Sequence, residues 1–138
     1  MMQEEIVRVH IGSSEDIVVA RRLARSIAHG MGFSGGTLTV LATVVSKLAR
    51  NILVHAGEGE VVLGNRSGPC GTGFSVRATD RGRRTAGVEH CSRDGSSGAN
   101  PLGLGLGGVS LTMDRFAVHS VAEGPFQGTT VTAIKWLN

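Results

Sequence analysis

Two helix-like segments that follow one another, residues 17–31 and 38–55, constrain the fold most strongly. In each segment the apolar residues recur every three or four positions, which is the spacing of the buried face of an α-helix. The second segment begins with Val- and Thr-rich sequence that favours a strand, but about 18 residues without a break are too many for one. Two successive helices argue against the strict βα alternation of a doubly wound parallel sheet. The expected buried stripe of the second helix is Leu41, Val44, Val45, Leu48 and Ile52.

Short segments of alternating or β-branched sequence predict the strands. They are residues 4–11, 60–65, 72–79, 115–121 and 129–136, with a turn at 66–69 and a third helix over 104–113. This order predicts an α+β fold, a two-layer α/β sandwich with a mixed, mostly antiparallel sheet and three helices on one face. The 138 residues suffice for a single domain, and with 4% aromatic residues its core must be aliphatic.

A glycine-rich segment, Gly103-Leu104-Gly105-Leu106-Gly107-Gly108, precedes the third predicted helix. Glycine lets a backbone approach a ligand closely, and a helix start offers free N–H groups that suit a phosphate. The segment therefore predicts a phosphate-binding loop, and a flexible turn is the alternative. It matches neither the dinucleotide fingerprint, which directly follows a strand, nor the P-loop, which needs Gly-Lys-Ser/Thr. The polar loop before it predicts a functional lid over residues 81–103.

Polar residues at helical spacing mark one face of the second helix. Lys47, Asn51 and His55 stand four positions apart and share that face. The amide oxygen of Asn51 suits Mg²⁺, which prefers oxygen ligands. A solvated helix face is the alternative interpretation.

Two strand ends also carry candidate ligand groups. Asp80-Arg81-Gly82 ends one strand, where a carboxylate accepts a hydrogen bond from an amino group such as that of adenine, and Gly82 admits the base. Thr129, after Gly128, begins the last strand and offers a hydroxyl to the same site. The alternatives are a common Asp-x-Gly turn and a strand-start Thr.

Basic residues gather in one part of the chain, although the net charge is only +3. The cluster is Arg77, Arg81, Arg83, Arg84 and Arg93. It indicates a solvated basic loop, a site for a triphosphate or acidic partner, or a nucleic-acid surface. The scarcity of aromatic residues disfavours a stacking platform for single-stranded nucleic acid.

The remaining composition points to the cytoplasm. Cys70 and Cys91 lack metal-ligand spacing and are expected to be reduced thiols. The polar residues 1–5 do not resemble a signal peptide, and we expect no apolar run that approaches the roughly 20 residues of a membrane span. We therefore expect a cytoplasmic protein without membrane contact.

Taken together, these motifs resemble the GHKL (Bergerat-fold) ATPases and, within them, the bacterial anti-sigma-factor serine/threonine kinases of the RsbT type, the switch kinases of stressosome signalling. The resemblance runs nearly end to end. The segments that carry it are DIVVARRLARSIAHGMGF (16–33), LARNILVHAGEGE (48–60), GLGLGGVSLTMDRF (103–116) and GTTVTAIKWL (128–137).

The resemblance implies a set of site residues and partners. Asn51 would bind Mg²⁺, Asp80 with Gly82 would recognise the adenine of ATP, and Thr129 would lie near the adenine. The glycines Gly103, Gly105 and Gly107, with Leu104 and Leu106 between them, would form the lid over the phosphates. Kinases of this family phosphorylate a Ser or Thr of a STAS-domain partner, and the RsbT-type kinase also activates a downstream phosphatase.

Two positions depart from the family pattern. Lys47 stands where the family has the glutamate expected to act as base or to orient water. A lysine cannot act as a carboxylate, although its charge can pair with phosphate. Arg84 replaces the second glycine of the Asp-x-Gly-x-Gly motif, where it would crowd the base or clamp the phosphates.

Three functional hypotheses therefore stand beside one another. The first is a Mg-ATP-dependent serine/threonine kinase acting on a STAS-domain regulator, and the second is a non-catalytic or weakly active module that sequesters such a partner. The third is a small basic nucleic-acid binder. For the oligomeric state, both a monomer and a homodimer are compatible with the sequence.

Overall fold

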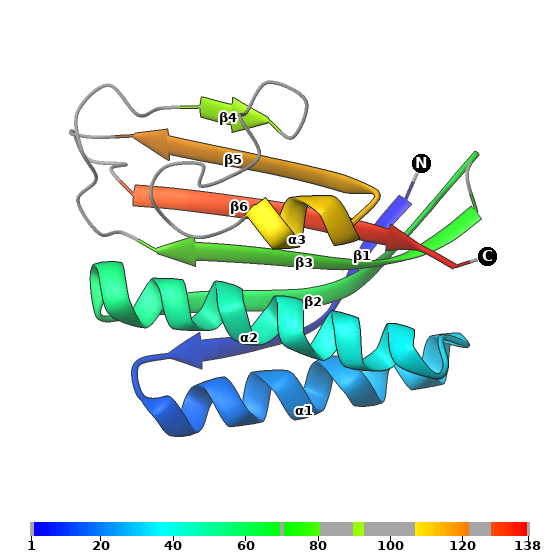
Figure 1. Cartoon of the computed structure of the whole chain (residues 1–138), viewed down its shortest axis with the longest axis horizontal. Coiled ribbons are helices and arrows are strands. Elements are labelled where there is room, and N and C mark those ends of the chain that lie inside the picture. The colour runs from blue at the N-terminus through cyan, green and yellow to red at the C-terminus, as the bar shows by residue number, and fades with distance from the viewer. Residues whose placement is uncertain (1, 70, 81–89, 93–106, 122–127, 138) are drawn as a thin grey trace.

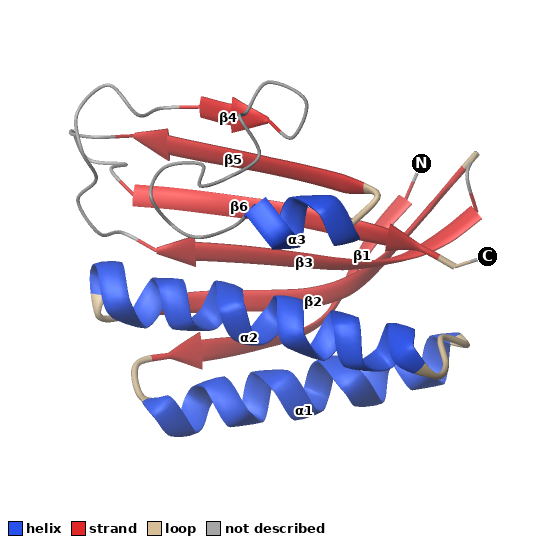
Figure 2. Cartoon of the chain, viewed as in Figure 1, coloured by secondary structure: helices blue, strands red, loops and turns tan. Residues whose placement is uncertain are grey.

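Six strands form one sheet in the order β1-β2-β3-β6-β5-β4, and every neighbouring pair is antiparallel. The computed structural model describes residues 2–69, 71–80, 90–92, 107–121 and 128–137. All three helices cover the same face of the sheet (Figures 1 and 2). In chain order the elements are β1 (Met2–Ile11), α1 (Ser14–Met31), α2 (Gly36–Ala56), β2 (Gly59–Gly68), β3 (Gly71–Asp80), β4 (His90–Ser92), α3 (Gly107–Thr112), β5 (Arg115–Val121) and β6 (Gly128–Trp136).

The two long helices lie side by side over β1, β2 and β3 (Figure 1). Helix α1 ends at Gly32, whose φ of 112° is a left-handed conformation that glycine adopts without strain. The next N–H group, that of Phe33, donates to the carbonyl of Ala28 at 3.0 Å, which completes a Schellman-type end. This end turns the chain back, so that α2 can run beside α1.

The core lies between the helices and one face of the sheet. Alternate residues of the central strands point into it, among them Phe74, Val76 and Ala78 of β3. All five residues of the expected α2 stripe, from Leu41 to Ile52, are at most 2% exposed. The helical periodicity of the sequence therefore predicted this layer correctly.

The structure confirms the α+β sandwich, but every described strand pair is antiparallel, so the prediction of a mixed sheet is wrong. It also corrects several boundaries. Strands β2 and β3 continue through residues 66–68 and 71–72, so the predicted turn at 66–69 is wrong, and Gly68 and Gly71 form the last pair of the hairpin. A short strand, β4, pairs with β5 inside the loop that was expected to lack strands. In the described part of the third helix, residues 107–112 are helical and Met113 is not, while residues 104–106 lie outside the described part.

Helix α2 also corrects the expectation about membrane spans. Its 21 residues are long and apolar enough to cross a membrane by length and composition. In the fold, however, α2 packs against the sheet, and eight of its residues are buried. Its apolar character therefore serves the core.

Charge is distributed unevenly over the two layers. Residues 17–57, which form nearly all of α1 and α2, contain no Asp or Glu. They carry Arg21, Arg22, Arg25, Lys47 and Arg50, all of which are exposed. Among the exposed carboxylates, Glu4, Glu5 and Glu58 lie on or beside β1 and β2, whereas Glu15 lies in the first turn of α1.

Leu48→Ala should destabilise the protein by about 2–5 kcal/mol, because Leu48 is 1% exposed in the centre of α2 and its loss leaves a cavity. Urea unfolding followed by circular dichroism measures this change. Val54→Ala is the matched control on the same helix, since Val54 is 67% exposed and should cost little. Equal losses in the two variants would contradict the packing described here.

Candidate active site

A row of four residues crosses the sheet where the apolar core ends. Gly59 of β2 pairs with Asp80 of β3, Asp80 pairs with Thr129 of β6, and Thr129 pairs with Ser120 of β5. Directly paired residues of antiparallel strands place their side chains on the same face. That face is the helix-covered one, because Val76 and Ala78 of β3, which share the alternation of Asp80, lie in the core.

The side chains of this row are polar and buried. Asp80 is 5% exposed, Thr129 is 3% exposed and Ser120 is 1% exposed. The Ser120 and Thr129 hydroxyl oxygens are 3.1 Å apart and share a hydrogen bond. Burying polar groups costs free energy unless they find partners, and the two hydroxyls find theirs in each other at the end of an otherwise apolar face.

Glycine at position 59 lets α2 come close to this row. A Cβ atom at Gly59 would lie 2.8 Å from Cγ2 of Ile52 on α2 and 2.3 Å from the carbonyl oxygen of Thr79. Neither distance leaves room for a side chain. The helix therefore touches the sheet here, and Asn51, which precedes Ile52, is half-buried close to this contact.

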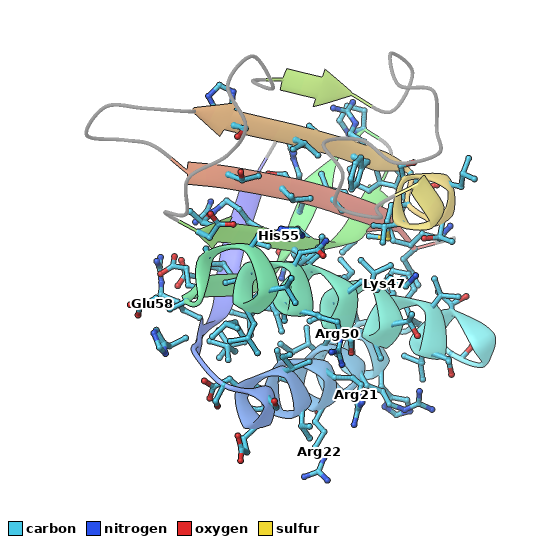
Figure 3. The ribbon with its side chains drawn as sticks, turned by 60° about the vertical axis from the view of Figure 1, so that its left-hand side comes forward. Arg21, Arg22, Lys47, Arg50, His55 and Glu58 are labelled. Atoms are coloured by element: carbon cyan, nitrogen blue, oxygen red, sulfur yellow. The ribbon has the colours of Figure 1, made fainter. Side chains whose placement is uncertain are left out.

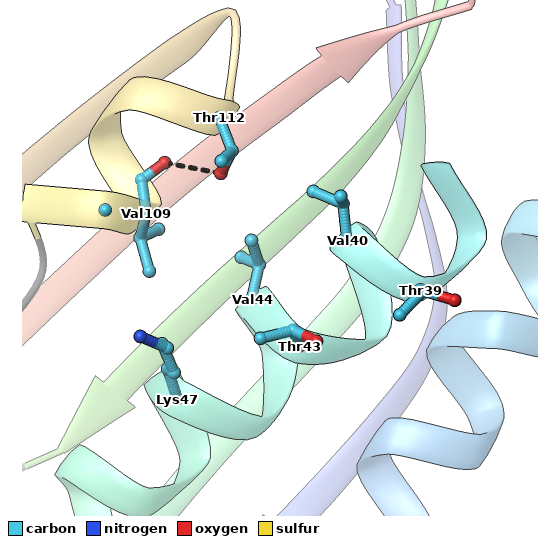
Figure 4. Close-up of a pocket in the computed structure, with 8 residues that line it drawn as sticks. Thr39, Val40, Thr43, Val44, Lys47, Val109 and Thr112 are labelled. Carbon is cyan, nitrogen blue, oxygen red and sulfur yellow. Dashed lines mark hydrogen bonds between the residues drawn. The ribbon is translucent and has the colours of Figure 1, made fainter. Parts of the chain in front are cut away.

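The polar face of α2 runs from this contact toward α3. Lys47 and His55 project from the same side of α2, and Lys47 lies at the end nearer α3 (Figure 3). Lys47 is exposed and borders a pocket of about 270 Å³ between the two helices (Figure 4). We call this pocket the α2–α3 groove; its lining is Thr39, Val40, Thr43, Val44 and Lys47 of α2 with Gly108, Val109 and Thr112 of α3.

A second pocket of about 510 Å³ reaches Asp80 and Gly59 from the side of β1 and β2. Its charged lining includes Arg8, which forms ion pairs with Glu5 at 2.9 Å and with Glu60. The hydrogen bond from Arg8 lowers the pKa of the exposed Glu5 carboxyl, and Glu5 in turn raises the pKa of Arg8. These charges are therefore paired with one another.

Comparison with known proteins identifies the family. No protein-family model matches the chain. Over 129 residues, which are 94% of this chain and 95% of its relative, the chain is 37% identical to "Serine/threonine-protein kinase RsbT" of Bacillus subtilis (strain 168). The chain belongs to the RsbT family of serine/threonine-protein kinases.

Membership of the RsbT family confirms the resemblance of the sequence, and the structure places several of the residues carried over from it. Asp80 and Thr129 lie side by side in the buried row. Lys47 and the first turn of α3, which begins at the buried Gly107, lie on either side of the α2–α3 groove. Asn51 lies on α2 between these two places.

Other site residues predicted for the RsbT-family chain lie outside the described residues. They are Gly82, Arg84, Gly103, Leu104, Gly105 and Leu106. The same holds for Arg81, Arg83 and Arg93 of the basic cluster, whereas Arg77 is half-buried in β3. The roles assigned to all these residues therefore remain predictions.

Sequence reasoning missed two members of the row, Ser120 and Gly59. Ser120 continues the alternation of Phe116 and Val118 on the inward face of β5, so a hydroxyl at an apolar position was the available signal. Gly59 stands just before the predicted strand at 60–65 and offers no side chain that could mark a site. Only its contact with Ile52 reveals that the missing side chain matters.

Gly59→Ala should destabilise the RsbT-family chain by about 1–3 kcal/mol, because the added methyl group forces α2 and β3 apart. The matched control is Gly30→Ala in α1, where an added Cβ meets nothing within 4 Å and alanine favours the helix. Urea unfolding of both variants measures the difference. A Gly59→Ala protein as stable as the Gly30→Ala protein would show that α2 does not depend on this contact.

Proposed function

We propose that this protein is a cytoplasmic, Mg-ATP-dependent serine/threonine kinase that phosphorylates a STAS-domain regulator in a bacterial partner-switching stress response. The observation that carries the proposal is the buried row Asp80–Thr129–Ser120 beside the polar face of α2. The 37% identity to the RsbT kinase supports the same function. A downstream phosphatase is the second partner we propose.

The chemistry of the row fits a purine base. The Asp80 carboxylate is an acceptor for the exocyclic amine of adenine, and the Thr129 hydroxyl, tied to Ser120, adds a second polar group beside it. A site built from buried polar groups discriminates strongly against a ligand that leaves them unpaired. We assign base recognition to these residues.

The polar face of α2 fits the metal and the phosphates. The Asn51 amide oxygen is a suitable Mg²⁺ ligand, and Lys47 lies four residues earlier on the same face of the helix. Bound ATP supplies the phosphoryl group, and the acceptor hydroxyl comes from the partner. The protein contributes positioning and charge neutralisation, which dominate catalysis of this kind. Gly103, Gly105 and Gly107 are proposed to cover the phosphates, and Arg84 to lie beside the base.

A second function, binding of the STAS-domain partner without phosphoryl transfer, is favoured by one specific observation. The residues that line the α2–α3 groove include Lys47 and no carboxylate. A general base contributes a factor of about 10²–10⁴ to such reactions, and a lysine ammonium cannot act as one. A protein that binds ATP and its partner but transfers phosphate slowly would act by sequestration.

Asp80→Asn should weaken Mg-ATP binding at least tenfold, because an amide replaces the charged acceptor of the adenine amine. Isothermal titration calorimetry with Mg-ATP measures the affinity, and circular dichroism confirms that the variant is folded. Glu15→Gln, a change at an exposed carboxylate in the first turn of α1, is the control and should bind ATP as the unmodified protein does. Unchanged binding by Asp80→Asn would remove Asp80 from the nucleotide site.

Lys47→Glu should raise the kcat of phosphate transfer to the cognate STAS-domain protein at least tenfold, because it restores a carboxylate beside the proposed metal ligand. Radiolabelled ATP and saturating acceptor make the rate measurable. Arg50→Glu introduces the same charge change on α2 one turn away from the groove and should leave the rate low. No gain in Lys47→Glu would show that Lys47 is not what limits transfer.

A further inference from the structure

The α2–α3 groove is apolar inside and lined by short side chains. Val44 and Val109, from the two facing helices, are each 2% exposed, and the remaining lining residues are Thr, Val, Gly and Lys47. The Thr112 hydroxyl donates to the Val109 carbonyl at 3.0 Å (Figure 4), so its hydrogen bond is made within α3. The interior of the groove therefore suits a hydrocarbon group.

The size of the groove suits a side chain of another molecule. Its volume of about 270 Å³ is below the roughly 300–1,000 Å³ of pockets that enclose a whole small-molecule ligand. Helix α3 also carries Leu111, which is 76% exposed, more than any other large hydrophobic residue in the described part of the chain. Leu111 thus adds an exposed apolar side chain to the helix that forms one wall of the groove.

Lys47 gives this apolar surface a charge preference. In the described part of the chain, no carboxylate lies within ion-pair distance of its ammonium group. The whole stretch from residue 17 to 57 also lacks Asp and Glu. A partner that places a carboxylate at Lys47 therefore meets a cation that has no carboxylate partner among the described residues, at the edge of an apolar cavity.

The position of Lys47 connects the groove to the proposed chemistry. Lys47 and Asn51 are one helical turn apart, and a turn of α-helix advances about 5.4 Å. A segment with an apolar side chain in the groove therefore has its neighbouring residues beside Lys47 and the proposed metal ligand.

We propose that the α2–α3 groove binds the acceptor segment of the protein substrate, with an aliphatic side chain between the helices and a nearby carboxylate paired with Lys47. This inference rests on the proposed kinase function and adds a sequence preference to it. The acceptor segment is thus expected to combine a Leu-, Ile- or Val-type residue with an acidic residue close to the Ser or Thr.

Position-scanned peptides test the preference directly. The probes are fluorescent nonapeptides with a central Ser among Gly and Ala residues, in which Leu and Glu are moved through the other positions. Binding is followed by fluorescence polarisation, with and without a non-hydrolysable Mg-ATP analogue. One arrangement should bind at least tenfold more tightly than its counterparts with Ala for Leu or Gln for Glu. Equal binding of all arrangements would overturn the proposal.

Variants of the groove test separately whether its apolar interior selects Leu and whether Lys47 selects Glu. Thr43→Trp fills the groove from an exposed position, and it should abolish the Leu preference while Mg-ATP affinity stays within twofold. Val54→Trp is the control on the same helix and should keep the preference. Lys47→Ala should abolish the Glu preference, and Lys47→Arg should retain it. If Thr43→Trp keeps the preference for Leu, or Lys47→Ala keeps the preference for Glu, the groove does not bind the acceptor.

The two proposals fail in different ways. Absence of Mg-ATP binding by the unmodified protein, measured calorimetrically, defeats the kinase function even if peptide selection persists. Peptides bound without selection, by a protein that binds Mg-ATP normally, defeat the groove alone. Lys47→Glu should change the two kinetic constants for different reasons. Its negative charge should repel an acidic acceptor and raise the KM, while the restored carboxylate should raise the kcat.

Discussion

The contact between α2 and β2 at Gly59 is the constraint on which the site depends. Because position 59 has no side chain, Ile52 packs directly against the backbone of the strand, and the polar face of α2 lies close to Asp80. The apolar stripe of α2 provides the free energy for this approach, since every member of it is nearly fully buried. Packing and function are therefore coupled, because the residues that hold the helix also set the width of the site.

Much of this architecture follows from sequence patterns, for identifiable reasons. Long amphipathic periodicity predicted α1 and α2, and the aliphatic alternation around Phe74 and Val131 predicted the central strands. Short elements were harder to predict. The three residues of β4 form a strand because they pair with β5, and no pattern in their own sequence predicts this pairing. The hairpin between β2 and β3 extends past Ser67 as far as the pair Gly68 and Gly71, although these small residues favour a turn in the sequence.

The candidate site divides in the same way. Asp80 and Thr129 could be predicted because they stand at strand ends within motifs, but their adjacency comes from the strand order β3-β6. Ser120 could not be assigned, since its burial and its hydrogen bond to Thr129 depend on that order too. Lys47 was found as a departure from a family pattern. Its place beside a groove depends on where α3 lies relative to α2, which the sequence alone does not determine.

The separation of charge between the layers affects how the protein meets other molecules. The outer surface of the two long helices carries cations and, from residue 17 to 57, no carboxylate, so this surface is locally positive. A locally positive surface attracts an anionic partner before the two molecules touch and raises the rate at which they meet. Lys47 lies on the second of these helices, and dissolved salt shortens the range over which the attraction acts.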